Sequence, residues 1–260
     1  MKKYKNLKTE WGDIVMINYD EYNLSFSEKI RGFSKGFGVT FGVIWLFYRI
    51  GIIALIAGVA GGIAGIKRHK KKLMEVRKDK LLEQFKSMLE SLATSYSAGR
   101  NTLNAYKDAQ KDMARSYGEN SYIVQEIKKI LEDNNNNIRI EKSLMDFAKR
   151  TGLEDIKSFA EVYESCDKAG GDIGKVISDT RLIINDKIDM EKDIQAGINA
   201  SKSNLNMIVI IGLVIVVLTG ADSSMSIASN TPVLFGIKTA VLIEIALSYR
   251  YGMKLADVKI

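Results

Sequence analysis

The chain has 260 residues, of which 46% are hydrophobic and 27% are charged, and its formal net charge is +7. A single cysteine excludes an internal disulfide, and one cysteine with one histidine excludes a Cys/His zinc site, which needs about four such ligands. A single proline beside 21 glycines disfavours a turn-rich β-sandwich and favours long helices.

The positive charge is concentrated beside an apolar run, which favours a membrane over nucleic acid as the partner of the basic residues. The densest cluster, KRHKKK at 67–72, directly follows the apolar region 32–66. Lysine and arginine collect on the cytoplasmic side of membrane spans. Residues 1–31 are polar, so we expect a cytoplasmic lead-in without a cleavable signal peptide, either a poorly ordered tail or a segment with an interfacial helix near Leu24–Ile30.

The apolar region 32–66 has two interpretations, one overlong span or two short spans that meet at Tyr48-Arg49. A single helix would place Arg49 near the bilayer centre, at a cost of about 2.5 kcal/mol or more. Two spans of roughly 17 residues are each just long enough, and basic residues flank both ends of the region. We therefore predict a transmembrane hairpin. Four glycines of its second span allow close helix approach: Gly58, Gly61, Gly62 and Gly65.

Residues 67–205 are predicted to form a cytoplasmic bundle of helices separated by glycines. Apolar residues recur at three- and four-residue spacing from Leu82 to Tyr96, which indicates a helix with one buried stripe. Asn101 is a plausible N-cap for the helix that follows. Helix ends are predicted at Gly99, Gly118, Asn134–Asn137, Gly152 and Gly170-Gly171.

The last helix of the bundle is predicted to continue into the membrane. Asp172 caps it, and no proline interrupts the chain before Gly220, although the sequence changes from charged to apolar. Such a helix would be about 75 Å long. Residues 206–249 are predicted as a second transmembrane hairpin with an outside loop at 221–231, and 250–260 as a cytoplasmic tail. The predicted class is all-α, an integral membrane protein in which two transmembrane hairpins flank one cytoplasmic bundle.

No constellation of residues predicts catalysis. GGDIGKV at 170–176 departs from the spacing of a phosphate loop, and Val176 cannot supply the magnesium hydroxyl. Cys166 falls on an apolar stripe and is predicted to be a core residue instead of a nucleophile. His69 is interpreted as a juxtamembrane residue instead of a phosphoacceptor. Because no nucleophile, base and orienting group come together, we expect neither an enzyme nor a bound cofactor.

The acidic residues around the double glycine offer oxygen ligands to a divalent cation. They are Glu161, Glu164, Asp167 and Asp172. A solvated helix end, with a favourable charge at the helix N-terminus, explains them better, so we expect no metal.

Two charged residues lie inside the last predicted span. Lys238 is near its outer end, where a lysine can extend its ammonium group to the surface. Glu244 lies deeper, and an intramembrane carboxyl group is a functional candidate. Packing against another polar group and a role in transport both remain open for Glu244.

Two stretches resemble the F domain of the type II secretion system. The opening helix pair of that domain resembles the stretch FKSMLESLATSYSAGRNTLNAYKDA. Its second half resembles the stretch FAKRTGLEDIKSFAEVYESCDKAGGDIGKVI. The resemblance covers about residues 80–205, and the flanking hairpins have the same order. A single F domain between two hairpins is similar to the platform proteins of the tight-adherence (Flp) pilus, and the ending looks closer to the TadB group than to the TadC group. A proline that many relatives carry in the span after the long helix is missing here.

The resemblance implies a non-enzymatic, multi-pass protein of the inner membrane, with the bundle and both termini in the cytoplasm. It would couple a cytoplasmic secretion ATPase (TadA-like) to pilin assembly, together with a second platform protein (TadC-like) and pilin subunits, and would form an oligomer. Nucleic acid is not an expected partner.

Helix lengths predict that the turns at 98–101 and 168–172 meet at the membrane-distal tip of the bundle. We expect this tip to contact the ATPase through Ser97, Gly99, Arg100, Lys168, Gly170, Gly171 and Asp172.

Two other functions compete with the platform. One is a small transporter or channel subunit that uses Glu244 and Lys238. The other is a signalling coiled coil, which needs sustained heptads, whereas the apolar stripes here break at glycines.

Overall fold

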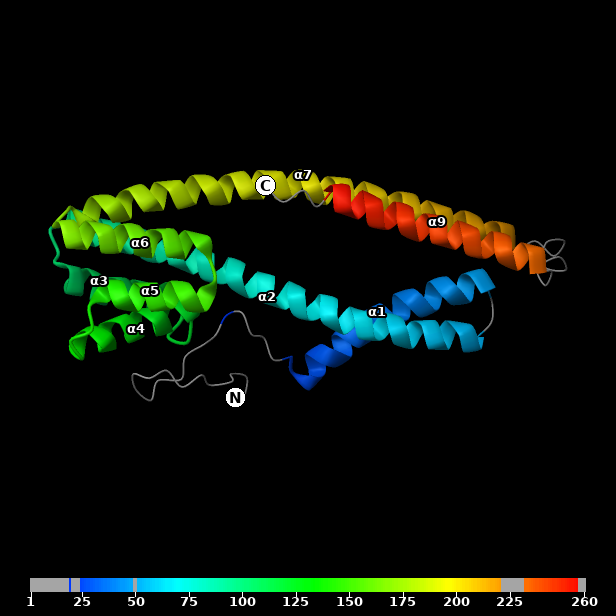
Figure 1. Ribbon diagram of the computed structural model, residues 1–260, viewed down its shortest axis with the longest axis horizontal. Helices are drawn as coiled ribbons and strands as arrows, with labels where there is room; N and C mark the ends of the chain where they lie inside the picture. Colours follow the sequence, from blue (N-terminus) through cyan, green and yellow to red (C-terminus); the bar gives the residue numbers. More distant parts are fainter. Residues whose placement is uncertain (1–18, 20–23, 49–50, 221–231, 257–260) are drawn as a thin grey trace. The chain divides into compact units, whose positions relative to one another are not determined.

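The computed structural model describes residue 19 and residues 24–48, 51–220 and 232–256 (Figure 1). All regular structure in these ranges is α-helical, so the predicted all-α class is confirmed. The helices are α1 Phe26–Tyr48, α2 Gly51–Ser97, α3 Thr102–Tyr117, α4 Tyr122–Asn135, α5 Ile140–Thr151, α6 Glu154–Ala169, α7 Ile173–Gly220 and α9 Pro232–Ala256.

The chain divides into two compact units that share helices α2 and α7. The first unit comprises Met1–Ser25 and His69–Ile188, and the second comprises Phe26–Arg68 and Asp189–Ile260. We predicted a bundle that extends to residue 205, whereas the first unit ends at Ile188. Most of residues 189–205 are exposed.

The core of the first unit is built from the apolar stripe predicted on α2. Phe85, Met88 and Leu92 are fully buried, as expected from their spacing. The ring of Phe85 lies 6.2 Å from that of Phe147 on α5 and 5.5 Å from that of Phe159 on α6, measured between centroids. Aromatic side chains thus join three helices that are far apart in the sequence.

The predicted helix ends agree with the observed ones within a few residues. Asn101 acts as the predicted N-cap of α3, because its side-chain oxygen accepts a hydrogen bond of 2.9 Å from the backbone N–H of Asn104. Gly99 and Gly170 have φ values of 74° and 67°, a conformation that glycine adopts more easily than other residues. These glycines end α2 and α6 and allow the chain to turn.

In the second unit, α1 packs closely against the beginning of α2. A Cβ atom on Gly65 would lie 2.5 Å from the carbonyl oxygen of Gly32, and a Cβ atom on Gly36 would clash with the carbonyl oxygen of Gly61. Phe37 covers Gly58 in the same way. The close helix approach expected from the glycines of α2 is therefore present.

The second unit also joins α9 to α7 and α1. The side chain of Leu205 on α7 lies 3.0 Å from the position that a Cβ atom on Gly252 of α9 would take. Tyr48 at the end of α1 donates a hydrogen bond of 2.8 Å to the hydroxyl of Thr239 on α9. These contacts connect helices from the two ends of the sequence.

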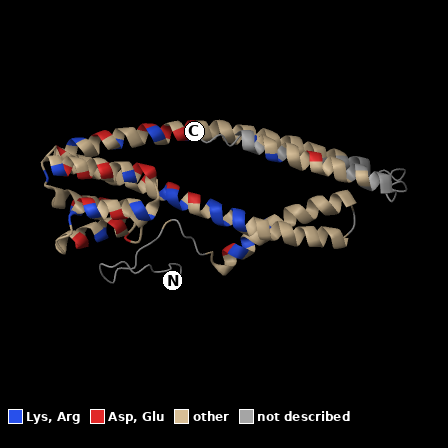
Figure 2. Cartoon of the chain, in the orientation of Figure 1, with Lys and Arg blue, Asp and Glu red and all other residues tan. Residues whose placement is uncertain are grey.

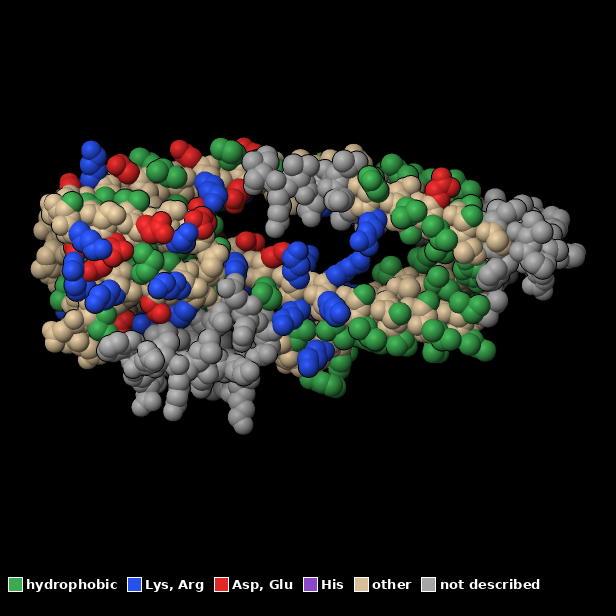
Figure 3. Space-filling model, viewed as in Figure 1, with side chains coloured by type: hydrophobic (Ala, Val, Ile, Leu, Met, Phe, Trp, Pro, Cys, Tyr) green, Lys and Arg blue, Asp and Glu red, His purple; other side chains and the backbone are tan. Residues whose placement is uncertain are grey.

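Among the described residues, α2 is the one helix that is long and apolar enough to cross a membrane. Its most apolar window of 18 residues has a mean hydropathy of 1.5, and 17% of that window is buried. Hydrophobic side chains cover much of the visible surface of α1, of the first half of α2 and of α9 (Figure 3). The length and composition of α2 are thus compatible with a membrane span.

Candidate functional site

The two turns that form the predicted tip lie together at one end of the first unit (Figure 1). A Cβ atom on Gly174, in the first turn of α7, would lie 3.2 Å from the Cβ atom of Tyr96 in the last turn of α2. The Tyr96 hydroxyl donates a hydrogen bond of 2.8 Å to Thr102, the first residue of α3. The ends of α2 and α6 and the starts of α3 and α7 are therefore neighbours.

The backbone of the turn before α7 is fixed by short-range contacts. Asp172 accepts a hydrogen bond of 3.1 Å from the backbone N–H of Lys175, as expected for the cap of α7. A Cβ atom on Gly171 would lie only 2.7 Å from the sulfur atom of Cys166, so a larger residue does not fit there. Cys166 itself is only partly buried, and its prediction as a core residue is wrong, because it lies in the last turn of α6 beside this exposed turn.

The two cations predicted to face a partner are exposed and form ion pairs with neighbours. Arg100 lies 3.6 Å from Asp108 of α3, and Lys168 lies 2.7 Å from Glu164 one helical turn before it. The hydrogen bond and charge of Lys168 lower the pKa of Glu164. Ser97 is the last residue of α2 and precedes Arg100 in the same exposed turn.

Three of the four acidic residues near the double glycine are paired with cations, and the fourth, Asp172, caps α7. Asp167 lies 2.5 Å from Arg139, Glu161 lies 3.8 Å from Lys157, and Glu164 pairs with Lys168. Within the described ranges, no group of three or more His, Cys, Asp or Glu side chains could hold a metal ion. The carboxylates of this turn thus take part in surface ion pairs.

The two intramembrane candidates both belong to α9. Glu244 is exposed, and no ion pair joins it to another described side chain. The side chain of Lys238 lies outside the described residues, as does the predicted loop at 221–231.

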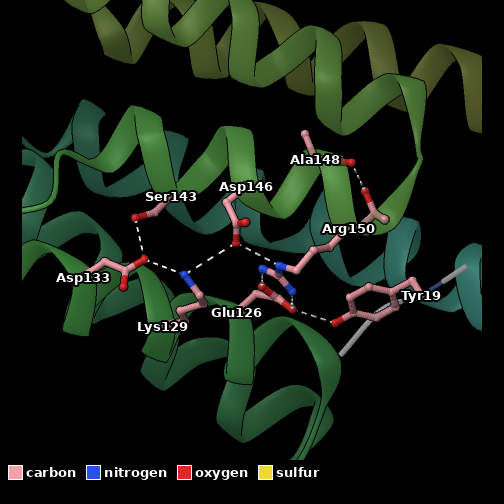
Figure 4. A network of polar contacts seen from close by, with 9 residues as sticks. Tyr19, Glu126, Lys129, Asp133, Ser143, Asp146, Ala148 and Arg150 are labelled. Carbon is pink, nitrogen blue, oxygen red and sulfur yellow. Dashed lines mark hydrogen bonds and ion pairs between the residues drawn. The ribbon is translucent and has the colours of Figure 1, made fainter. Parts of the chain in front are cut away.

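A buried network of charged side chains connects α4 and α5 (Figure 4). Arg150 forms two parallel hydrogen bonds with Glu126, at 2.8 and 2.5 Å, and a third of 2.9 Å with Asp146. Only 11% of the Arg150 side chain and 5% of the Glu126 side chain are exposed. A bidentate pair of this kind gives both strength and a defined geometry, because two parallel bonds fix the planes of both groups.

The network continues through Lys129 toward the other end of α5. Lys129 lies 3.6 Å from Asp146 and donates a hydrogen bond of 2.7 Å to Asp133, which also accepts one of 2.7 Å from Ser143. Each buried charge therefore has a partner of opposite sign. Removing one partner of such a pair is expected to cost several kcal/mol, because it leaves an uncompensated charge in the interior.

Tyr19 attaches the N-terminal part of the chain to this network. Its hydroxyl donates a hydrogen bond of 2.9 Å to Glu126, and its backbone N–H donates one of 3.1 Å to the carbonyl oxygen of Arg150. Its ring packs edge-on against Tyr122 at a centroid distance of 5.8 Å. Among the described residues of the predicted lead-in 1–31, Tyr19 thus contacts the bundle.

Burial and contacts with neighbouring charges shift the pKa values of Tyr19 and Arg150 in the direction that keeps each of these two groups in its observed state. Burial, reinforced by the charge of Glu126, raises the pKa of Tyr19 well above its usual value. Burial opposes the charge of Arg150, but its hydrogen bonds with Glu126 and the charges of Glu126 and Asp146 raise its pKa overall. The tyrosine therefore stays neutral and the guanidinium group stays charged at any ordinary pH.

Sequence reasoning missed the network, although part of the signal was present. Lys129 and Asp133, and likewise Asp146 and Arg150, are four residues apart and can pair along one helix. Their burial and the contribution of Tyr19 depend on how α4 packs against α5. The spacing of residues within one helix gives no information about that packing.

Comparison with known proteins gave no match: no family model, no curated protein and no solved structure resembles the chain closely enough to be assigned. The function must therefore be argued from the residues and their geometry.

Proposed function

We propose that this chain is a non-enzymatic platform protein of the inner membrane, TadB-like, that couples a cytoplasmic secretion ATPase to pilin assembly in a type IV (Tad/Flp-type) pilus or a related secretion machine. One observation carries the proposal. Helices α2 and α7 each run without a break between the bundle and an apolar segment, and each contributes residues to both compact units.

Two continuous helices suit a protein that transmits motion. At 47 and 48 residues, α2 and α7 are each about 70 Å long. The C-terminal end of α2 and the N-terminal end of α7 both belong to the tip, so a partner bound there contacts both helices at once. Movement of the tip would then be transmitted along the hydrogen-bonded backbone of each helix, with no flexible linker between the tip and the apolar segment.

The contacts of the second unit support its role as the membrane part of the platform. The glycine contacts between α1 and α2 are typical of helices that associate within a membrane. In lipid no hydrophobic effect drives helices together, so close approach of their backbones supplies the packing energy. In the proposed topology, α1 with the start of α2 forms one transmembrane hairpin. The end of α7 with α9 forms the other, and both termini and the bundle are cytoplasmic.

The proposed partners follow from the two ends of these helices. The tip, with exposed Arg100 and Lys168, is proposed to bind the secretion ATPase, and the hairpins to bind pilin subunits. A second platform protein, TadC-like, and further copies of the chain would complete the assembly. No ATP hydrolysis is assigned to this chain.

Charge reversal at the tip tests the proposal. The double variant Arg100→Glu/Lys168→Glu should lose co-purification with a co-expressed hexameric secretion ATPase and still insert into membranes. The matched control is Lys111→Glu/Arg115→Glu, which changes the charge equally on an exposed part of α3 far from the tip along that helix. Unchanged co-purification of the tip variant, or equal loss in the control, would contradict a specific contact at the tip.

A single substitution separates the contact from the local ion pair. Glu164→Gln removes the partner of Lys168 but keeps its positive charge exposed. If the ATPase recognises the cation, this variant keeps co-purification. If the variant behaves like Lys168→Glu, the effect comes from disturbing the turn, and the proposed contact is wrong.

A further inference from the structure

The glycine contacts fix the antiparallel register of α1 and α2 in the second unit. Gly36 lies against Gly61, and one step further toward the start of α1, Gly32 lies against Gly65. Each step of four residues back along α1 is matched by a step of four residues forward along α2. The next residues on the same two faces, three or four positions on, are Lys29 and Glu28 of α1 and Arg68 and His69 of α2.

This register places two positive residues at facing positions where the glycine contact ends. Both side chains are exposed, and no ion pair joins either of them to another residue that the structure describes. Like charges at neighbouring helix positions repel each other. A closely packed helix pair that ends in two facing cations therefore offers a site for an anion that contacts both.

The surroundings of the two cations are mostly basic or apolar, with one acidic residue, Glu28, in the first turn of α1. Arg31 and Lys67 are also exposed and add positive charge. Phe26 is 78% and Ile30 is 52% exposed in the first turns of α1. Lys and Arg residues are concentrated on α2 where its uncharged stretch ends (Figure 2). An anion at this boundary would have an apolar neighbour, which fits a phospholipid better than a free ion.

We propose that Lys29 and Arg68 together bind the phosphate group of an anionic phospholipid, and that the lipid stabilises the crossing of α1 and α2. The arginine offers a planar set of donors that suits a phosphate oxygen pair, and the lysine adds a point charge. Ile30, the residue after Lys29 in the direction of the membrane, contacts the acyl chains. The inference rests on the proposed membrane placement of these helices and is independent of the proposed ATPase contact.

The test uses the full chain purified in a neutral detergent. The midpoint of thermal unfolding and the amount of retained lipid are measured with added phosphatidylglycerol, with phosphatidylcholine and with inorganic phosphate. Phosphatidylglycerol should raise the midpoint, and the other two should not. Lys29→Gln/Arg68→Gln should weaken phosphatidylglycerol binding roughly thirtyfold, as expected for the loss of two basic residues at an anionic surface.

The control variant Lys111→Gln/Arg115→Gln removes an exposed pair of neighbouring cations from α3 and should bind phosphatidylglycerol as the unaltered chain does. Equal loss in both double variants would show that charge alone attracts the lipid, and would overturn the site. Equal protection by inorganic phosphate would overturn the phospholipid as the ligand.

A charge swap supplies a readout that does not depend on lipid binding. Lys29→Glu replaces the facing cations by an ion pair with Arg68, so it should raise the unfolding midpoint without added lipid and abolish the response to phosphatidylglycerol. A lower midpoint for Lys29→Glu would contradict the proposed register.

If the unaltered chain fails to float with vesicles of any composition, the membrane placement is wrong. If it floats equally with neutral and anionic vesicles and shows no lipid preference, only the lipid site is wrong.

Discussion

At the scale of single residues, two buried tyrosines differ in whether their hydroxyl groups form hydrogen bonds. Tyr19 donates its hydroxyl to a carboxylate that already holds Arg150. Tyr106 is fully buried as well, but its hydroxyl oxygen has no hydrogen-bond partner among the described residues. Removing the hydroxyl should therefore have opposite consequences at the two positions.

Tyr19→Phe should destabilise the first unit by about 1.5–3 kcal/mol, because it removes a buried hydrogen bond to a charged acceptor. The unfolding midpoint of the detergent-purified chain, followed by circular dichroism, measures this loss. Tyr251→Phe is the control, because 71% of Tyr251 is exposed. Equal stability of both variants would mean that the N-terminal anchor does not contribute to the folded bundle.

Tyr106→Phe should be neutral or stabilising by about 1 kcal/mol at neutral pH, because it removes a polar group that is buried without a partner. A loss as large as that expected for Tyr19→Phe would contradict the unpaired state of this hydroxyl.

These two tyrosines and a third buried one, Tyr163, predict instability at alkaline pH. Burial raises the pKa of Tyr19, Tyr106 and Tyr163, so the folded state holds these protons after the unfolded chain has lost them. Stability is fully present below the unfolded value, near pH 10, and falls above it by about 1.4 kcal/mol per pH unit for each tyrosine. Unfolding midpoints between about pH 9 and 11 should fall less steeply in Tyr106→Phe. An unchanged slope would contradict the raised pKa of this residue.

At the scale of the helices, most boundaries could be predicted because local chemistry determines them. The side chain of Asn101 caps α3, and Gly170 adopts the left-handed conformation that ends α6. Helix α1 ends at Tyr48 and α2 begins at Gly51, on either side of the position at which two short spans were predicted to meet. The interpretation of Cys166 was wrong, because periodicity gives the face of a helix but not where along it the core ends.

The crossing of α1 and α2 gives a prediction about close packing. Gly36→Val should destabilise the second unit by about 1–3 kcal/mol, because its side chain would overlap the backbone of α2 at Gly61. Gly38→Val is the control, because no atom lies within 4 Å of a Cβ at that position. Both variants change helix propensity equally, so the difference between their unfolding midpoints reports the helix contact. Equal midpoints would contradict the close approach.

At the scale of the whole molecule, the sequence predicted the all-α class and the long helices but could not place the buried charges. Helix periodicity and glycine positions are local signals, whereas the network of Glu126, Lys129 and Arg150 exists only after α4 and α5 pack together. The meeting of the two turns at the tip was predicted from helix lengths. Both long helices were expected to connect the membrane with the bundle over similar lengths, so their membrane-distal ends were expected to lie close together. What binds the tip depends on a second molecule.

Membrane topology tests the central claim, that two transmembrane hairpins flank a cytoplasmic bundle. Cys166→Ser provides a background without cysteine. Into it, Ser116→Cys places an exposed thiol on α3, and Ser224→Cys places one in the predicted outside loop. A membrane-impermeant maleimide should label Ser224→Cys in intact cells, and Ser116→Cys only after the membrane is permeabilised. Labelling of Ser116→Cys in intact cells, or protection of Ser224→Cys until permeabilisation, would contradict the proposed platform topology.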